Sequence, residues 1–112
     1  MTLESLKAYG ANTDEGLNRC MNNEAFYLRM VGMALEDRSF DALETAVKAE
    51  DARAAFEAAH ALKGSIGNVA LTPIYEPICA LTELLRGSDK WVDGGEALFR
   101  QIMDGREKAL AL

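Results

Sequence analysis

His60 is the only histidine of the 112-residue chain, and it stands in the stretch AAHALKGSIGNVAL. Lys63 follows three residues later and Gly64 four residues later. A neutral imidazole can bind a metal, act as a general base or carry a covalently bound group. A lysine one turn away disfavours a metal cation and attracts an anionic group such as a phosphoryl group. The pattern therefore favours phosphoryl chemistry at His60.

Two glycines, Gly64 and Gly67, follow His60 within a segment that otherwise has the composition of a helix. A glycine inside a helix costs about 1 kcal/mol relative to alanine. Both glycines fall on the same side of the helix as His60, so they leave bare backbone beside the imidazole. We interpret them as positions that allow another molecule to approach. Close helix packing is the alternative, and it is weaker for Gly64, which points away from the apolar stripe.

The helix that carries His60 is expected over residues 52–70, with Asp51 as its N-cap. At about 100° per residue, its apolar stripe falls within an arc of about 80°. The stripe consists of Ala55, Ala59, Leu62, Ile66 and Val69. His60 lies about 150° from the centre of this arc. We therefore predict that His60 is exposed to solvent near the middle of the helix.

The rest of the chain also has helical patterns joined by short caps, with no period-two run that would indicate strands. The expected elements are a helix over 3–9 closed by Gly10, a second capped by Thr13, a third capped by Asn22 or Asn23, a fourth over 41–50, the histidine helix, one that starts at Thr72-Pro73 and ends at Gly87, and a last one capped by Ser88 that includes Trp91. The predicted fold class is all-α: an antiparallel up-down four-helix bundle with a short N-terminal covering helix, in a single domain over 1–112.

Composition argues against several classes of protein. Eighteen acidic and twelve basic residues give a net charge of -6, which disfavours nucleic acid as a partner. No apolar run approaches the roughly 20 residues of a membrane span, and the N-terminus lacks a signal-peptide pattern. Cys20 and Cys79 fit neither a metal nor a redox spacing, so both are interpreted as reduced cysteines in or near the core. These features predict a cytoplasmic protein, with a monomer as the expected state.

The segment His60-Ala-Leu-Lys63-Gly64-Ser65 resembles the H-x-L-K-G-S motif of histidine-containing phosphotransfer (HPt) domains, the four-helix-bundle relays of bacterial and fungal phosphorelays. The similarity extends over roughly residues 10 to 86 and includes Asp51 and the segments GLNR, NEAFY and CALTE. The resemblance implies that His60 is phosphorylated through Nε2, that Lys63 stabilises the phosphoryl oxygens, and that Gly64 lets the partner's active-site loops close in.

The same resemblance implies partners. These are response-regulator receiver domains, a hybrid histidine kinase, or both. No cofactor is expected in this chain itself, because the receiver domain would bring Mg²⁺.

Two positions depart from the family pattern. Many members have glycine ten residues after the histidine, where this chain has Ala70, and a small packing adjustment is expected there. Several members have glutamine twenty-two residues after the histidine, where this chain has Thr82. Because a threonine hydroxyl is shorter, the contact with the imidazole or phosphate is expected to involve Thr82 weakly, or water or Ser65 in its place.

Three other functions are less compatible with the sequence. Histidine kinases have an acidic residue after the histidine and a proline nearby, whereas Ala61 follows here, so neither kinase nor ATP-binding activity is expected. A hydrolase that uses His60 as a general base would need a converging nucleophile and a cleft. The alternative that we retain is a helical adaptor or inhibitor that docks on a receiver domain or kinase without being phosphorylated. A pure docking surface has no need of His60, Lys63 and Gly64 together.

Overall fold

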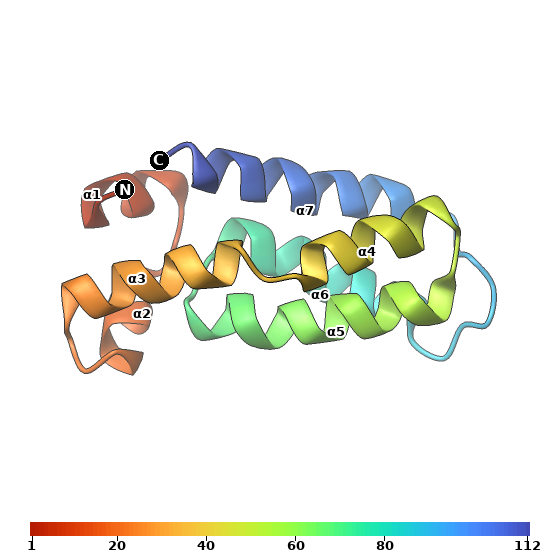
Figure 1. The fold of residues 1–112 in the computed structure, drawn as a ribbon, viewed down its shortest axis with the longest axis horizontal. Helices are drawn as coiled ribbons and strands as arrows, with labels where there is room; N and C mark the ends of the chain where they lie inside the picture. Colours follow the sequence, from red (N-terminus) through yellow and green to blue (C-terminus); the bar gives the residue numbers. More distant parts are fainter.

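The computed structural model describes residues 1–112 and consists of α-helices without a strand (Figure 1). The predicted all-α class is confirmed. None of the helices combines the length and the apolar character that a membrane crossing requires. The helices are α1 (Leu3–Tyr9), α2 (Thr13–Arg19), α3 (Glu24–Leu35), α4 (Ser39–Lys48), α5 (Ala52–Asn68), α6 (Thr72–Leu85) and α7 (Gly95–Leu110).

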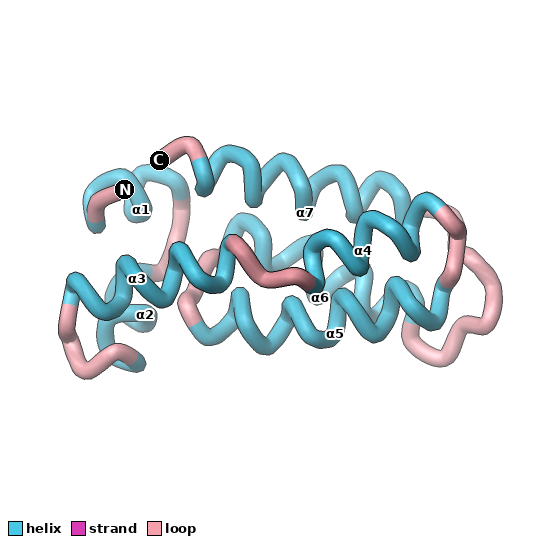
Figure 2. The backbone as a smooth tube through the Cα atoms, viewed as in Figure 1, coloured by secondary structure: helices cyan, strands magenta, loops and turns pink.

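Helices α3 and α4 follow one another along the molecule, with a short break at 36–38 between them (Figure 2). The chain then reverses direction between α4 and α5, between α5 and α6, and between α6 and α7 (Figure 1). Helix α5 packs against α4 and α6, and α6 packs against α7. The short helices α1 and α2 cover one end, where the Tyr9 hydroxyl donates a hydrogen bond to the Gly105 carbonyl at 2.7 Å. This arrangement leaves one long side of α5 without a covering helix.

Burial of the apolar stripe fixes the rotation of α5. Ala55, Ala59, Leu62 and Ile66 have no exposed surface, and Val69 is almost completely buried. Full burial of a leucine or isoleucine contributes about 1.5–3 kcal/mol each, so turning another face of α5 inward would be strongly unfavourable. The predicted core face of this helix is confirmed.

Most of the predicted helix ends are close to those observed. The Asp51 side chain accepts a hydrogen bond from the Ala54 N–H at 3.1 Å, and Asn23 accepts one from the Phe26 N–H at 3.0 Å. Helix α2 is capped by Asn12 and not by Thr13, which is buried at the first helical position. Asn12 is the better cap because its carboxamide oxygen reaches the N–H of a residue three positions on.

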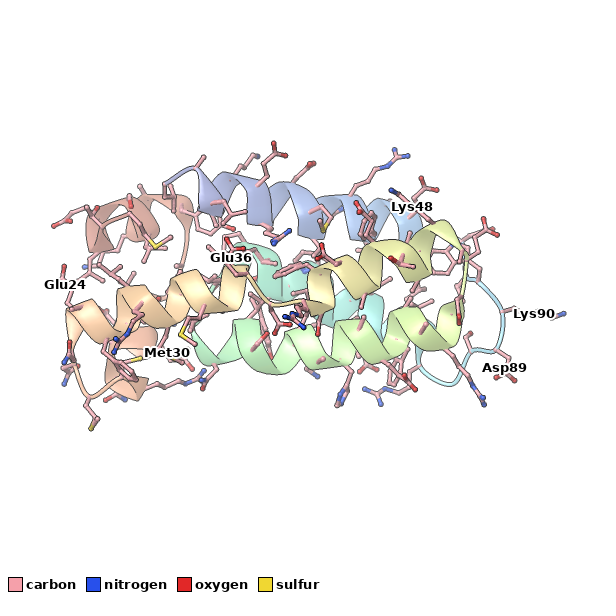
Figure 3. The ribbon with its side chains drawn as sticks, viewed as in Figure 1. Glu24, Met30, Glu36, Lys48, Asp89 and Lys90 are labelled. Atoms are coloured by element: carbon pink, nitrogen blue, oxygen red, sulfur yellow. The ribbon has the colours of Figure 1, made fainter.

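The prediction that Ser88 caps the last helix is wrong. Helix α7 begins only at Gly95, and Gly94 has a φ of 95°, a left-handed conformation that interrupts the helix before this point. Trp91 lies in the preceding loop, and its ring covers Gly95 so closely that a Cβ there would lie 2.8 Å from Trp91 Cζ2. Asp89 and Lys90 lie in this loop, at the end of the molecule opposite α1 and α2 (Figure 3).

Helix α5 ends in a Schellman motif. The Ala70 N–H donates to the Gly67 carbonyl at 3.1 Å, and the Leu71 N–H donates to the Ile66 carbonyl at 3.4 Å. Ala70 has a φ of 58°, which is left-handed. Glycine is the usual residue at this position because its missing Cβ removes a steric cost of about 1–2 kcal/mol. The departure from the family pattern therefore changes the backbone energy at the helix end in addition to the packing.

Replacing Ala70 with glycine should raise the free energy of unfolding by up to about 1 kcal/mol, because relief of the left-handed strain exceeds the entropy that glycine adds to the unfolded chain. Urea unfolding followed by circular dichroism measures the change. Ala49→Gly is the matched control, because Ala49 ends α4 with a φ of -84° and should only lose stability. A clear loss of stability in Ala70→Gly would show that the buried methyl group of Ala70 contributes more than its backbone strain costs.

Candidate functional site

His60 lies in the middle of α5 on its uncovered side, and its side chain is exposed as predicted. The Phe56 ring, one turn earlier, lies 5.8 Å from the imidazole between centroids at an interplanar angle of 35°. The guanidinium of Arg86, the residue that follows α6, lies over the Phe56 ring at 5.3 Å. Phe56 therefore gives the imidazole a fixed neighbour on one flank and leaves the remaining directions open to solvent. Sequence reasoning did not find Phe56, although its i–4 spacing from His60 is a usable signal.

Lys63 lies on the flank of α5 that faces α6 and is half-buried. Arg86 donates hydrogen bonds to Glu83, and these together with its charge hold the pKa of the Glu83 carboxyl below its usual range. The positive charge of Lys63 lowers the same pKa further. The Lys63 ammonium thus lies near a carboxylate of α6, one turn along α5 from the histidine. A cation in this position can attract anionic oxygens held at the imidazole.

The two glycines after the histidine have different surroundings. A Cβ added at Gly64 would meet no atom within 4 Å, so the backbone there borders open space. A Cβ at Gly67 would lie 2.7 Å from Cε1 of Tyr75 on α6. Our interpretation of Gly67 as an access position is therefore wrong, because this glycine allows the aromatic ring to pack on α5. Gly64 is the exposed glycine beside His60.

A cleft of about 450 Å³ begins at Lys63 and Gly64, one turn after His60, and runs along α5 toward its C-terminal end. Its walls come from α2, α5 and α6. The lining residues are Glu15, Arg19, Lys63, Gly64, Gly67, Asn68, Ala70, Thr72 and Tyr75. Arg19 and Lys63 supply two positive charges against the one carboxylate of Glu15, and the cleft consequently has an excess of positive charge that suits anionic groups.

Ser65 faces away from this cleft. Its hydroxyl lies 3.5 Å from the Leu62 carbonyl and is directed toward Asp37, in the break between α3 and α4. Burial raises the pKa of Asp37, but hydrogen bonds from the Ser39 backbone and from the Ser65 and Ser39 side chains outweigh this effect and lower it. Ser65 therefore does not provide the expected contact with the imidazole in this structure.

Thr82 does not reach the imidazole either. Its side chain is completely buried, and its hydroxyl donates a hydrogen bond to the Ile78 carbonyl of its own helix at 2.8 Å. A threonine inside a helix commonly satisfies its hydroxyl in this way, which leaves no donor for a distant group. The structure thus brings together His60, Lys63 and Gly64, and places Ser65 and Thr82 elsewhere.

The two cysteines are free, with Cys20 buried and Cys79 half-buried. Cys20 makes part of the apolar core. Both therefore agree with the interpretation of reduced cysteines in or near the core.

The sequence that forms this arrangement is similar to that of one known protein family. The family model of the Hpt domain matches residues 29–109, which include the whole of α4, α5 and α6 and the exposed histidine. Searches of curated proteins and of solved structures find no match. Hpt domains take part in histidine phosphotransfer in phosphorelays, where they interact with receiver domains and kinases. Because the match covers most of the sequence and contains the site, the chain belongs to the Hpt domain family.

Proposed function

We propose that this protein is a phosphorelay intermediate that carries a phosphoryl group on His60 between receiver-domain aspartates. The observation that supports this most is the combination on one uncovered helix face of an exposed imidazole, a flanking ammonium and open space at Gly64. A covalent carrier must expose its nucleophile to two successive partners, and a buried histidine could not do so.

The transfer step forms one bond and breaks another. The lone pair of His60 Nε2 attacks the phosphorus of an aspartyl phosphate on the receiver domain. The P–O bond to the aspartate breaks, and its electron pair leaves on the carboxylate oxygen. Transfer to a second receiver domain reverses these events. Because such transfers pass through a loose transition state, positioning and charge stabilisation supply most of the catalysis.

This chain contributes the nucleophile, the Lys63 cation and an unobstructed approach. Under this proposal it needs no cofactor of its own, and the receiver domain brings the Mg²⁺ that neutralises phosphoryl charge. Neither kinase activity nor ATP binding is part of the proposal. The partners are response-regulator receiver domains, a hybrid histidine kinase, or both.

The arrangement of the helices fits an antiparallel up-down bundle in which α3 and α4 together count as one helix beside α5, α6 and α7. In this description α1 and α2 form the N-terminal cover, and residues 1–112 make one domain. We further propose that the protein acts as a cytoplasmic monomer. Such a bundle provides a rigid support for a site that consists of a single helix face.

Incubation with a panel of phosphorylated, ³²P-labelled receiver domains tests the proposed function. We expect label to move to this chain and to be lost in acid but retained in base, as a phosphoramidate bond requires. The competing function, an adaptor or inhibitor that is never phosphorylated, predicts binding to a receiver domain without any uptake of label. Acid-stable label would place the phosphoryl group on a different type of side chain.

Replacing Lys63 with alanine should slow transfer from the phosphorylated receiver domain by roughly tenfold, because an electrostatic contact to the phosphoryl oxygens is lost from a partly solvated site. The phosphorylated form should also be less favoured at equilibrium. Rapid-quench transfer assays measure both quantities. Lys48→Ala on α4 is the control, since Lys48 is exposed and lies on a different helix. Equal rates for the two variants would show that Lys63 is an ordinary surface residue.

A further inference from the structure

Helix α2 forms one wall of the cleft beside α5, the helix that carries His60. The Arg19 guanidinium donates one hydrogen bond to the Gly67 carbonyl of α5 and another to the Glu15 carboxylate of its own helix. This places Arg19 in the same cleft as Lys63 and Gly64. Helix α2 lies outside residues 29–109, so this wall is not part of the segment that matches the family model.

The two contacts hold Arg19 in place and leave other N–H donors of its guanidinium without a partner. A guanidinium has five N–H donors in a fixed plane, and the two hydrogen bonds employ one on Nη1 and one on Nη2. The side chain keeps 42% of its surface exposed. A fixed cation with free donors can bind a carboxylate with little further loss of side-chain entropy.

Arg19 cannot share the role of Lys63 at the phosphoryl group. Its anchor on α5, Gly67, comes seven residues after His60, which is about 10 Å along the helix axis. A group bound at Arg19 is therefore on the surface of the docked partner and away from the reacting atoms. A receiver domain that binds Mg²⁺ must hold it with carboxylates, so acidic side chains lie on its phosphoryl-bearing face. This chain has a net charge of -6 and repels such a face overall. A local excess of positive charge, which Arg19 and Lys63 provide against the single carboxylate of Glu15, favours contact between two such faces.

We propose that Arg19 is a docking residue that binds an acidic side chain on the phosphoryl-bearing face of the receiver domain, away from the phosphoaspartate itself, and that α2 thereby belongs to the partner-binding surface. This inference rests on the proposed phosphotransfer function. It assigns to Arg19 an effect on association with the partner and none on the chemistry at His60.

The test compares two phosphodonors on the full chain. Arg19→Glu should lower the second-order rate constant of transfer from a phosphorylated receiver domain by roughly tenfold at low ionic strength, and this deficit relative to the wild type should shrink as salt is added. Labelling of His60 by phosphoramidate, which needs no docking surface, should not change. Arg100→Glu is the matched control because Arg100 also pairs with a glutamate four residues earlier, Glu96, but lies on α7 away from the cleft.

A second variant separates docking from a structural role of the contact between Arg19 and α5. Glu15→Gln retains Arg19 and its hydrogen bond to the Gly67 carbonyl and removes one negative charge from the cleft. It should speed transfer from the receiver domain about twofold to threefold at low salt. Equal loss of receiver and phosphoramidate labelling in Arg19→Glu, or unchanged receiver transfer in both variants, would overturn the proposal. If the wild-type chain takes label from phosphoramidate but from no receiver domain, the proposed function fails and this inference fails with it.

Discussion

Replacing His60 with glutamine should abolish the uptake of phosphoryl groups while the protein folds normally. Glutamine keeps the polarity of the position and has a good helix propensity, but it lacks a nucleophilic ring nitrogen. The side chain at this position is exposed and makes no hydrogen bond, so the core loses nothing. The expected result is wild-type circular dichroism together with no acid-labile label from either a phosphorylated receiver domain or phosphoramidate.

Binding of the receiver domain gives this experiment its control. His60→Gln should still bind the receiver domain with an affinity close to that of the wild type, because the rest of the helix face is unchanged. A variant that still accepts label at the wild-type rate would place the carrier at another residue. A variant that neither binds nor folds would show that His60 supports the structure.

Gly64→Gln should slow transfer from a phosphorylated receiver domain by about 100-fold, because a displacement of about 1 Å between reacting groups is sufficient for a loss of this size. No atom lies within 4 Å of the Cβ position at Gly64, so the added side chain fits the free protein and occupies the space through which the partner approaches. Phosphoramidate is small and should label His60 in this variant at a rate within a few-fold of the wild type. Comparison of the two donors measures access to the imidazole separately from its reactivity.

Stability measurements on alanine variants complete this test. Gly64→Ala should raise the free energy of unfolding by up to about 1 kcal/mol, because alanine is the better helix former and meets no neighbour. Gly67→Ala should lower it, since its Cβ would lie 2.7 Å from the Tyr75 ring. If Gly64→Gln transferred from the receiver domain at the wild-type rate, the exposed glycine would have no role in access.

The rotation of α5 was predictable because it depends on local spacing. The apolar stripe, the Asp51 cap and the exposed position of His60 all follow from the helical repeat of this one segment, and each is observed. What was missed at Gly67 depends on a contact between segments that are distant in sequence, because the ring of Tyr75 on α6 decides its role. Ser65, in contrast, lies about 140° around the helix from His60, so the helical repeat of α5 already places it away from the imidazole. No periodicity within α5 indicates the contact between Tyr75 and Gly67.

The start of α7 and the position of Arg19 in the cleft were also missed. Ser88 is a residue type common at N-caps, but α7 begins only after Gly94, which has a left-handed φ, and the Trp91 ring covers the first residue of the helix, Gly95. Arg19 is a basic residue in the last turn of a helix, which is common and predicts no special role. Only the packing of α2 on the end of α5 brings it into the cleft. The start of α7 thus depends on local backbone geometry that a capping pattern does not show, and the position of Arg19 depends on a tertiary contact.

The contact between Phe56 and His60 has a spectroscopic consequence. Because the chain has one histidine, the two carbon-bound protons of its imidazole give the only such pair of resonances in a proton NMR spectrum. The Phe56 ring, at 5.8 Å, adds a ring-current shift that moves these signals from their positions in a free histidine. Phosphorylation at Nε2 changes the electron density of the imidazole ring. The fraction of His60 that is phosphorylated can thus be followed in real time from two proton resonances, without isotope labelling of the protein.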